Sequence, residues 1–411
     1  MKIIHLLYAD SGGGHNAVYR VHQALLKKKI DSQMWVIKSK LDDNTVKQPL
    51  SKFQMIIIKL FLFFVNNFIV RLIKTKNLEK HSVSFFSSSF LKKINNCDAD
   101  IINLHWIQGE MLSIKDISKI KKPIVWTLHD MWAFCGAEHY TNDNRWQEGY
   151  NLNNRPSYER GFDLNRWTWK RKKKYWKKQF QIVTPSKWLA SCVSKSALMK
   201  NYPVSVIPNP IDADFWRPMN KDTAKKELNL PTDVPLILFG AMGGGKNPRK
   251  GFDLLLNSLQ NLKKNSKNKN FELIVFGENK NESNSKMSFP VNYLGHVYNN
   301  TNLQIIYNAA DVMVVPSKQD NLPSTAVEAQ ICGTPVVSFD IGGLGDIIDH
   351  KKTGYLAKAF DIKDFADGIS WVLDQSRSKE LRNNARERSV IKFSEYKVAD
   401  DYLKIYKNLL K

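Results

Sequence analysis

Short apolar runs alternate along the whole chain with longer stretches in which apolar residues recur every three or four positions. The short runs predict strands and the longer stretches predict helices. The strands expected are 3–8, 34–37, 101–104, 124–127, 182–184, 236–239, 272–276, 291–293, 312–315 and 336–339. Because strands that alternate with helices form parallel sheets, the pattern predicts an α/β fold.

A polar segment rich in proline divides these strands into two groups. It spans 207–218, reads IPNPIDADFWRP, and has the composition of a linker. A length of 411 residues also fits two domains of the usual size, about 100–200 residues each. We therefore expect a first domain over 1–207, a second over 208–390, and a terminal helix over 391–411 that packs back on the first.

Positive charge is concentrated in the first half of the chain. The whole chain has 62 basic and 39 acidic residues and a net charge of +23, and residues 1–210 alone hold 34 basic and 15 acidic side chains. Such an excess indicates an anionic partner, which is a membrane surface, a lipid diphosphate or a nucleic acid. One segment, 167–178 (WTWKRKKKYWKK), fits a nucleic-acid stripe, an interfacial helix or a solvated basic face.

The apolar segment 55–73 (MIIIKLFLFFVNNFIVRLI) is the nearest approach to a membrane span. Four polar residues interrupt it, namely Lys59, Asn66, Asn67 and Arg71, so we expect no transmembrane helix here, but either an interfacial helix or an ordinary buried one. The apolar run at the N-terminus is too short for a signal peptide, and the four cysteines form no CxxC pair. These features predict a cytoplasmic protein without a cysteine-built metal site.

The segment 320–337 (DNLPSTAVEAQICGTPVV) holds the most informative chemistry. Thr325 and Glu328 fit a capping box, so we expect a helix that starts at Thr325, carries Glu328 in its first turn and ends at Cys332-Gly333. Asp320 then lies in the loop before the helix. Helix N–H groups attract phosphate and carboxylates accept from sugar hydroxyls, so the pair suits a nucleotide-sugar. Alternatively, Glu328 only caps its helix and Asp320 is a solvated loop residue.

Other candidate residues follow expected strands, where ligands bind in open α/β sheets. The loop 240–252 (GAMGGGKNPRKGF) offers Lys246, Arg249 and Lys250 to a diphosphate, although it lacks the GKS or GKT of a Walker loop. His129 can donate to a sugar or its leaving phosphate, or it is a satisfied core histidine.

The glycines at 12–14 follow the first strand and fit the loose dinucleotide fingerprint Gly12-x-Gly14-x-x-Ala17. No acidic residue ends the second expected strand, which argues against NAD. Two interpretations remain open: a glycine turn that lets a phosphate or a sugar approach the backbone, and a tight turn between a strand and a helix.

Taken in order, the segments SGGGHNAVYRVHQAL, VWTLHDMWAFCGAEHY, IVTPSKWLA, VIPNPID, RKGFDLLL, VNYLGHV, DNLPSTAVEAQICGTPVV, IGGLGDII and TGYLA cover nearly the whole chain. Their combination resembles the retaining glycosyltransferases of family 4 type. These have the GT-B fold, two Rossmann-like parallel-sheet domains that face a central cleft, and they include bacterial enzymes of capsule, exopolysaccharide and O-antigen biosynthesis.

The resemblance implies roles for residues of the second domain, which is the nucleotide-sugar domain of such enzymes. Glu328 is expected on the ribose hydroxyls, Asp320 against the donor sugar, and Lys250 on the diphosphate. The other expected substrate contacts are the main chain of Asn321, Leu322, Ser324 and Thr325, the stretch with His296 and Val297 beside the base, and Arg249 or Lys246 on the diphosphate.

In the first domain, the resemblance places His129 near the reacting carbon, and Gly13 and Gly14 near the phosphate and the acceptor. Three departures from the family pattern stand out. Asp320 takes the place of the usual glutamate, and the usual arginine near Gly240 is absent. The segment after the HD motif keeps only Cys135 of the several cysteines common in relatives.

The implied reaction is a sugar transfer that retains anomeric configuration and needs no cofactor, metal ion or protein nucleophile. The expected partners are a nucleoside diphosphate sugar, a polyprenyl-diphosphate-linked saccharide and the anionic inner face of the cytoplasmic membrane, with no nucleic acid. A nucleotide-sugar epimerase on the same architecture is one alternative. From another class, the basic charge alone suggests a nucleic-acid-binding protein, which does not account for Asp320 and Glu328.

Overall fold

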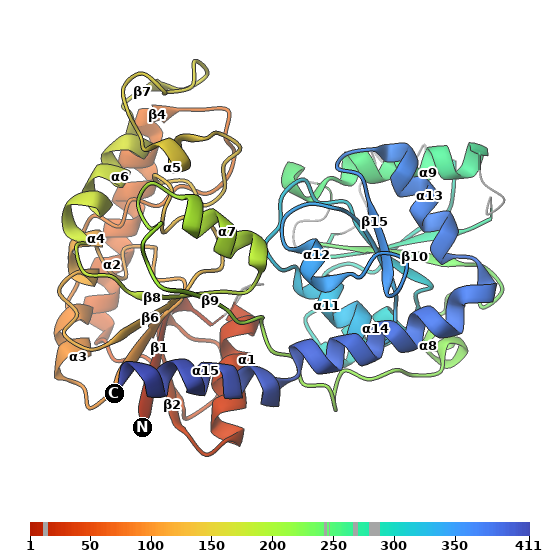
Figure 1. The fold of residues 1–411 in the computed structure, drawn as a ribbon, viewed down its shortest axis with the longest axis horizontal. Helices are drawn as coiled ribbons and strands as arrows, with labels where there is room; N and C mark the ends of the chain where they lie inside the picture. The colour runs from red at the N-terminus through yellow and green to blue at the C-terminus, as the bar shows by residue number, and fades with distance from the viewer. Residues whose placement is uncertain (11–14, 242–244, 246, 266–269, 279–287) are drawn as a thin grey trace. The chain divides into compact units, whose positions relative to one another are not determined.

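The computed structural model describes residues 1–10, 15–241, 245, 247–265, 270–278 and 288–411 (Figure 1). The chain divides into two compact units, of which one comprises Met1–Asn209 with Val398–Lys411 and the other Pro210–Lys397. The division falls inside the proline-rich segment 207–218. Residues 391–397 stay with the second unit, so the part of the terminal segment that joins the first unit is shorter than expected.

The first unit is built on a parallel sheet in the order β3-β2-β1-β5-β6-β8-β9. Its strands are β1 (Lys2–Ala9), β2 (Asp31–Lys38), β3 (Val46–Lys47), β5 (Ile101–Leu104), β6 (Ile124–Thr127), β8 (Gln181–Thr184) and β9 (Val204–Val206), with β4 (Ile73–Lys74) and β7 (Arg160–Gly161) as a separate antiparallel pair. Its helices are α1 (His15–Lys27), α2 (Lys52–Phe64), α3 (Phe90–Asn96), α4 (Ile114–Ile117), α5 (Arg145–Glu148), α6 (Leu164–Tyr175) and α7 (Lys187–Lys195).

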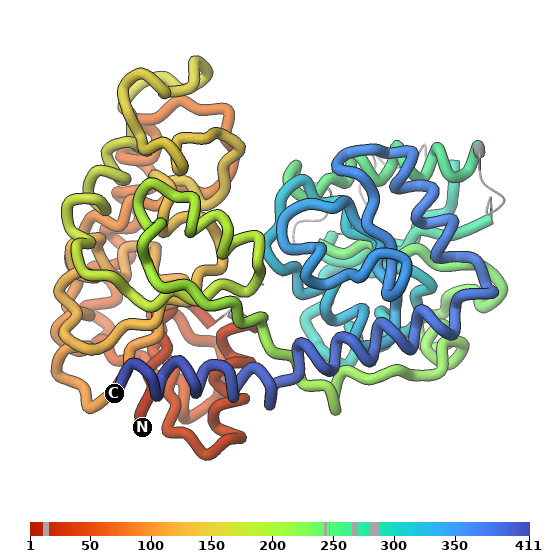
Figure 2. Tube along the Cα trace, viewed as in Figure 1, coloured from red at the N-terminus to blue at the C-terminus, as the bar shows by residue number. Residues whose placement is uncertain are grey.

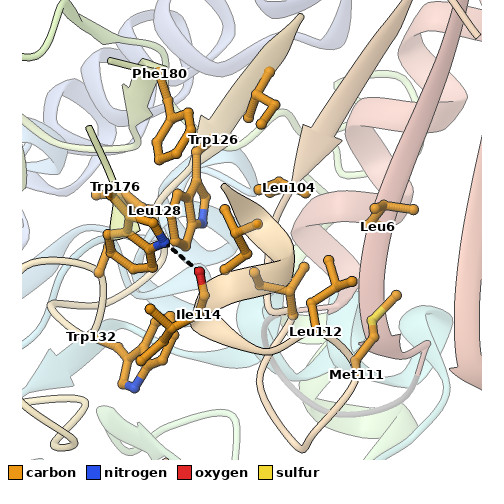
Figure 3. Close-up of a cluster of buried hydrophobic side chains, with 14 of the residues drawn as sticks. Leu6, Leu104, Met111, Leu112, Ile114, Trp126, Leu128, Trp132, Trp176 and Phe180 are labelled. Carbon is orange, nitrogen blue, oxygen red and sulfur yellow. Dashed lines mark hydrogen bonds between the residues drawn. The ribbon is translucent and has the colours of Figure 1, made fainter. Parts of the chain in front are cut away.

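Alternate residues of these strands face two different cores, as expected for a sheet covered on both faces. One face packs against α1 and the terminal helix α15 (Glu395–Leu409), whose last turns lie beside the N-terminal elements in Figure 2. The other face packs against an aromatic cluster, shown in Figure 3, in which the Trp176 indole N–H donates to the carbonyl of Ile114 at 2.9 Å.

The second unit repeats this plan with a parallel sheet in the order β12-β11-β10-β13-β14-β15. Its strands are β10 (Leu236–Gly240), β11 (Glu272–Phe276), β12 (Val291–Tyr293), β13 (Val312–Val315), β14 (Val336–Phe339) and β15 (Gly354–Ala357). Its helices are α8 (Lys221–Glu227), α9 (Phe252–Asn265), α10 (Asn300–Ala309), α11 (Ser324–Ile331), α12 (Leu344–Ile347), α13 (Ile362–Val372) and α14 (Ser378–Phe393). All ten expected strands are present, and β3, β4, β7, β9 and β15 were not predicted.

The apolar segment near residue 60 differs from its prediction. After α2 the chain stays helical through a π turn (Val65–Ile69) and a 3-10 turn (Val70–Leu72). The resulting 21-residue helix, Lys52–Leu72, has a mean hydropathy of 2.0 and is long and apolar enough to cross a membrane by length and composition alone. The expectation that no segment qualifies is therefore wrong, because two widely spaced charges are too few to lower the hydropathy of a helix this apolar.

The same helix is not an ordinary buried one. Only 11% of its most apolar stretch is buried, and Ile58 is the one residue of α2 in the core. The basic segment 167–178, for which a nucleic-acid stripe, an interfacial helix and a solvated basic face all remained open, is partly buried. Trp169 and Trp176 are buried and belong to the core of the first unit, so neither indole is exposed to stack on a base.

Candidate active site

Helix α11 begins at Ser324, one residue earlier than predicted. Pro323 is its N-cap, with a φ of −64°, and no side chain caps the first turn. The predicted capping box between Thr325 and Glu328 is therefore wrong, because the proline, whose ring fixes φ in the helical range, shifts the helix start. Glu328 consequently lies in the second turn. The predicted end is confirmed, since Cys332 is the C-cap and Gly333 has a φ of +79°.

Glu328 is buried and takes a hydrogen bond from another helix. The hydroxyl of Tyr307, in α10, donates to Glu328 Oε2 at 2.8 Å. Tyr307 is itself fully buried and packs against Trp216 and Phe276. The tyrosine therefore orients the carboxylate, a role that no local sequence pattern indicates.

Asp320 lies between β13 and α11, where polar groups surround its carboxylate. Lys250 donates to Oδ2 at 2.6 Å, Ser317 donates to the same oxygen at 3.1 Å, and the N–H of Asn321 donates to Oδ1 at 3.2 Å. Burial raises the pKa of Asp320, but the charges of Lys250 and Arg249 outweigh it and hold the pKa below the ordinary 3.8. The carboxylate is therefore ionised at neutral pH, and the alternative of a solvated loop residue is wrong.

Two loops join around this carboxylate. The N–H of Lys318 donates to the carbonyl of Arg249 at 2.7 Å, and the Arg249 guanidinium donates to the carbonyl of Gln319 at 2.8 Å. Gly251 has a φ of +67°, and a Cβ there would lie 2.0 Å from the carbonyl oxygen of Pro316. Because β10 and β13 are parallel neighbours, the loops at their carboxyl ends meet at one edge of the sheet.

A third loop, between β14 and α12, contacts the main chain of Asp320. Gly342 has a φ of +56°, and a Cβ added to it would lie 2.0 Å from the carbonyl oxygen of Asp320. The N–H of Gly343 donates to that same oxygen at 3.0 Å. The two glycines thus fix the backbone that carries Asp320. Their signal in the sequence is a glycine pair in the short loop after an apolar strand.

In the first unit, His129 follows β6 and lies beside His105, which follows β5. His129 Nε2 and His105 Nδ1 are 3.1 Å apart. Burial lowers the pKa of His129 to about 4, despite the neighbouring Asp130 carboxylate, and lowers the pKa of His105 well below its usual value. Both imidazoles are therefore neutral at pH 7, and a neutral imidazole can donate one hydrogen bond and accept another.

The remaining predicted residues are spread more widely. Asn321 and Leu322 are buried, whereas Ser324 and Thr325 are half-buried at the helix start. The Asn321 N–H was expected on the substrate, and here it is directed to Asp320. After β12, His296 is exposed and Val297 packs against the core of the second unit. Gly13, Gly14 and Lys246 lie outside the described residues.

Metal ligands do not cluster in the part of the chain that the structure describes, where no group of three or more His, Cys, Asp or Glu side chains could hold an ion. The four cysteines are free thiols, three of them buried.

The two parallel-sheet Rossmann-like domains define the GT-B fold, and the same fold occurs in solved structures over the whole chain. Sucrose-phosphate synthase from Thermosynechococcus elongatus has a TM-score of 0.67 at 16% identity and covers 100% of this chain and 99% of its own. HepE of Anabaena, solved in complex with UDP and glucose, has a TM-score of 0.62 at 13% identity and covers 99% of each chain.

Sequence comparison identifies the family. The model described as Glycosyltransferase Family 4 matches residues 11–215, and the model described as Glycosyl transferases group 1 matches residues 220–389. Since the two matches together span nearly all of it, the chain belongs to the group 1, family 4 type of glycosyltransferases. A curated relative, D-inositol 3-phosphate glycosyltransferase of Saccharomonospora viridis, is 27% identical over 221 residues, or 50% of each chain. The chain thus spans about half the length of the curated relatives it matches.

Proposed function

We propose that this protein transfers a sugar, with retention of anomeric configuration, from a UDP- or GDP-sugar to a lipid-linked saccharide in surface polysaccharide biosynthesis. The observation that carries the proposal is the junction of two loops at Asp320, where Lys250 and Arg249 pair with a carboxylate that lies shortly before α11 in the chain. Family membership supports the reaction class, and a solved structure of the same fold holds UDP and glucose.

The donor diphosphate is the group that these loops suit. In sugar transfer, negative charge develops on the leaving diphosphate, so cations fixed beside it favour the transition state. Lys250 and Arg249 provide two positive charges, and the first N–H groups of α11 add an anion-binding end. With this charge supplied by side chains, the proposed reaction requires no metal ion. Asp320 then acts by holding Lys250 in place as well as by facing the donor sugar.

Glu328 suits the ribose of the nucleotide. A carboxylate can accept from both ribose hydroxyls, and the hydrogen bond from Tyr307 to Oε2 keeps that carboxylate in one orientation. His129 suits the donor sugar, because a neutral imidazole can donate to a hydroxyl without adding charge near an oxocarbenium-like carbon.

The surface of the first unit supports a proposal for the acceptor and for the cellular location. We propose a polyprenyl-diphosphate-linked saccharide as acceptor, reached by an enzyme that lies on the cytoplasmic face of the inner membrane. Helix Lys52–Leu72 supports this, because its exposed large apolar residues recur mostly every three or four positions and so lie on one side of the helix. They are Phe53, Ile56, Leu60, Phe63, Phe64, Phe68 and Leu72. Exposed basic residues flank them, namely Lys52, Lys59, Arg71, Lys74 and Lys76.

The first test is thermal-shift binding of UDP, GDP and ADP to the wild type and to Glu328→Ala. Stabilisation by one nucleotide that disappears in the variant supports the site and selects the donor base. Glu380→Ala, which removes an exposed carboxylate from the same unit, is the matched control and should keep the shift. If no nucleotide stabilises the wild type, the proposed function fails.

A further inference from the structure

Three histidines from three adjacent strands form a continuous line in the first unit. His5 lies within β1 and is fully buried, with its Nδ1 atom 3.0 Å from His105 Nε2. His105 Nδ1 in turn lies 3.1 Å from His129 Nε2. The strands β1, β5 and β6 are neighbours in the parallel sheet, and His105 and His129 lie just after the second and third of them. The line begins in the core and ends at a residue of the candidate site.

The two contacts restrict which ring nitrogen of each histidine carries a proton. Each of the two contacts needs one N–H and one lone pair, and a neutral imidazole carries one proton. If His105 accepted at both nitrogens it would be an anion, and if it donated from both it would be a cation. Burial lowers the pKa of all three histidines, so the charged forms are not populated at neutral pH. The three tautomers are therefore linked, and only two arrangements remain.

The two arrangements differ in what His129 offers to its surroundings. In one, His5 donates to His105 and His105 donates to His129 Nε2, so His129 must carry its proton on Nδ1. In the other, all three protons are on Nε2, and His129 offers only a lone pair at Nδ1. The second arrangement also places an N–H on His5 Nε2, a buried atom without a hydrogen-bond partner among the described residues. An orphaned buried donor of this kind is rare in proteins.

We propose that His5 and His105 are positioning residues that hold His129 in the Nδ1–H tautomer, so that His129 donates to the donor sugar. This inference rests on the proposed function for the identity of the sugar, but the tautomer itself is a property of the free protein. It assigns a role to two buried histidines, His5 and His105. His5 and His105 act through His129, and because all three imidazoles are neutral, they add no charge to the site.

The test is nitrogen NMR of the full-length protein labelled with 15N-histidine, since the 15N shift separates protonated from unprotonated ring nitrogens. The His129 signals are identified by their loss in His129→Gln. The Nε2–H tautomer predominates in free neutral histidine, so the expected Nδ1–H form is distinctive. A wild-type His129 protonated on Nε2 would overturn the proposal.

Two substitutions of nearly equal size test whether His105 sets the tautomer. His105→Asn keeps an amide N–H near the position of Nδ1 and should keep the Nδ1–H form of His129. His105→Leu removes the donor and should return His129 to the Nε2–H form. His81→Asn is the control, since His81 is buried in the same unit but its Nδ1 atom lies 2.8 Å from the carbonyl oxygen of Glu79 instead. The same tautomer in all three variants would contradict the proposal.

Enzyme kinetics provide a second measurement, and together with nucleotide binding they distinguish a failure of this proposal from a failure of the proposed function. We expect His105→Leu to lower kcat for sugar transfer about tenfold or more, with little change in KM, and His105→Asn to restore most of it. If the Nδ1–H tautomer is observed but no nucleotide binds, the positioning role stands and the proposed function fails. If nucleotide binds but His129 is protonated on Nε2, the reverse holds.

Discussion

The ammonium of Lys250 donates to the carboxylate of Asp320 at 2.6 Å and so joins two loops whose residues are 70 positions apart in sequence. Asp320 is almost fully buried, and Lys250 is only 21% exposed at its side chain. An ion pair removed from water to this degree is strongly destabilised when one partner is lost. The contact therefore couples the stability of the second unit to the position of the cation that we assign to the diphosphate.

Replacing Lys250 by methionine should destabilise the second unit and abolish nucleotide binding. The substitution leaves Asp320 with Arg249 as its nearest cation, at 3.7 Å. We expect a loss of about 2 kcal/mol, less than for a fully buried pair because Lys250 is partly exposed. Lys318→Met is the control, since it breaks an exposed ion pair with Asp253 in the same region. Chemical denaturation with and without nucleotide measures both effects, and equal stability of the two variants would contradict the prediction.

The loss of stability caused by Lys250→Met should depend on pH, and it should be largest at neutral pH. In the wild type the folded pKa of Asp320 lies below 3.8, so its stabilising contribution is present above that pH and is lost as pH falls through the folded pKa. Without Lys250, burial should raise the pKa of Asp320. The variant is then least stable relative to wild type at neutral pH, and the difference should shrink as Asp320 takes up a proton. Melting temperatures from pH 7 to pH 3 test this, and a constant difference would contradict it.

Tyr307→Phe should weaken nucleotide binding although Tyr307 itself is fully buried. The substitution removes the hydroxyl that donates to Glu328 Oε2, so the carboxylate loses its fixed orientation. A hydrogen bond to a charged group contributes about 1.5–3 kcal/mol, so we expect at least a tenfold rise in Kd by calorimetry. Tyr396→Phe, at a position of the same unit that is 52% exposed, should leave Kd unchanged. Equal Kd values for Tyr307→Phe and wild type would exclude this orienting role.

The alternation of apolar runs was enough to predict both sheets, since central strands of parallel sheets are apolar on both faces. The strands that escaped prediction are short or lie at sheet edges. Strand β3 is two residues long and β15 opens on Gly354, so their pairing depends on the neighbouring strand more than on their own sequence. At α11 a local pattern misled, because Pro323 sets the start of the helix more strongly than a threonine cap.

In the candidate site, too, some residues could be predicted from the local sequence and others could not. Lys250 and Asp320 were each indicated by their place after an expected strand, and the structure shows that their loops meet. The residues that orient Glu328 and His105 were not predictable. Tyr307 reaches Glu328 from another helix, and the contact between His5 and His105 depends on the register of β1 against β5. Such contacts arise from tertiary packing between segments far apart in sequence, so a single sequence carries no local signal for them.

The terminal helix α15 should contribute strongly to the stability of the first unit. Tyr406 is fully buried, and its hydroxyl accepts from the amide of Asn103 at 2.8 Å. Tyr406→Phe leaves that buried amide without this acceptor, which costs about 1–3 kcal/mol. Tyr396→Phe, at a half-exposed position of the same helix, should cost almost nothing. Urea unfolding of the full chain, followed by a probe of the first unit, distinguishes the two, and coincident transitions would contradict the prediction.

The helix Lys52–Leu72 should bind anionic membranes through its exposed apolar face. Ile58 and Val65 attach it to the first unit, while the side chains of Leu60 and Phe63 are exposed. The double variant Leu60→Ser and Phe63→Ser removes two large side chains from the contact. Because burying one such side chain contributes about 1.5–3 kcal/mol, we expect sedimentation with anionic vesicles to fall at least tenfold. Ile391→Ser, at an exposed position of the second unit, should leave binding unchanged.

Salt and vesicle composition then separate the apolar from the electrostatic part of this binding. The basic residues that flank the helix act within a Debye length of about 10 Å at 0.1 M salt, so their contribution should decrease as salt is added. The apolar contribution should persist, and it should be the part that the double variant loses. Binding that disappears at high salt and is unaffected by the double variant would show that positive charge alone recruits the protein, and the helix would then have no role at the membrane.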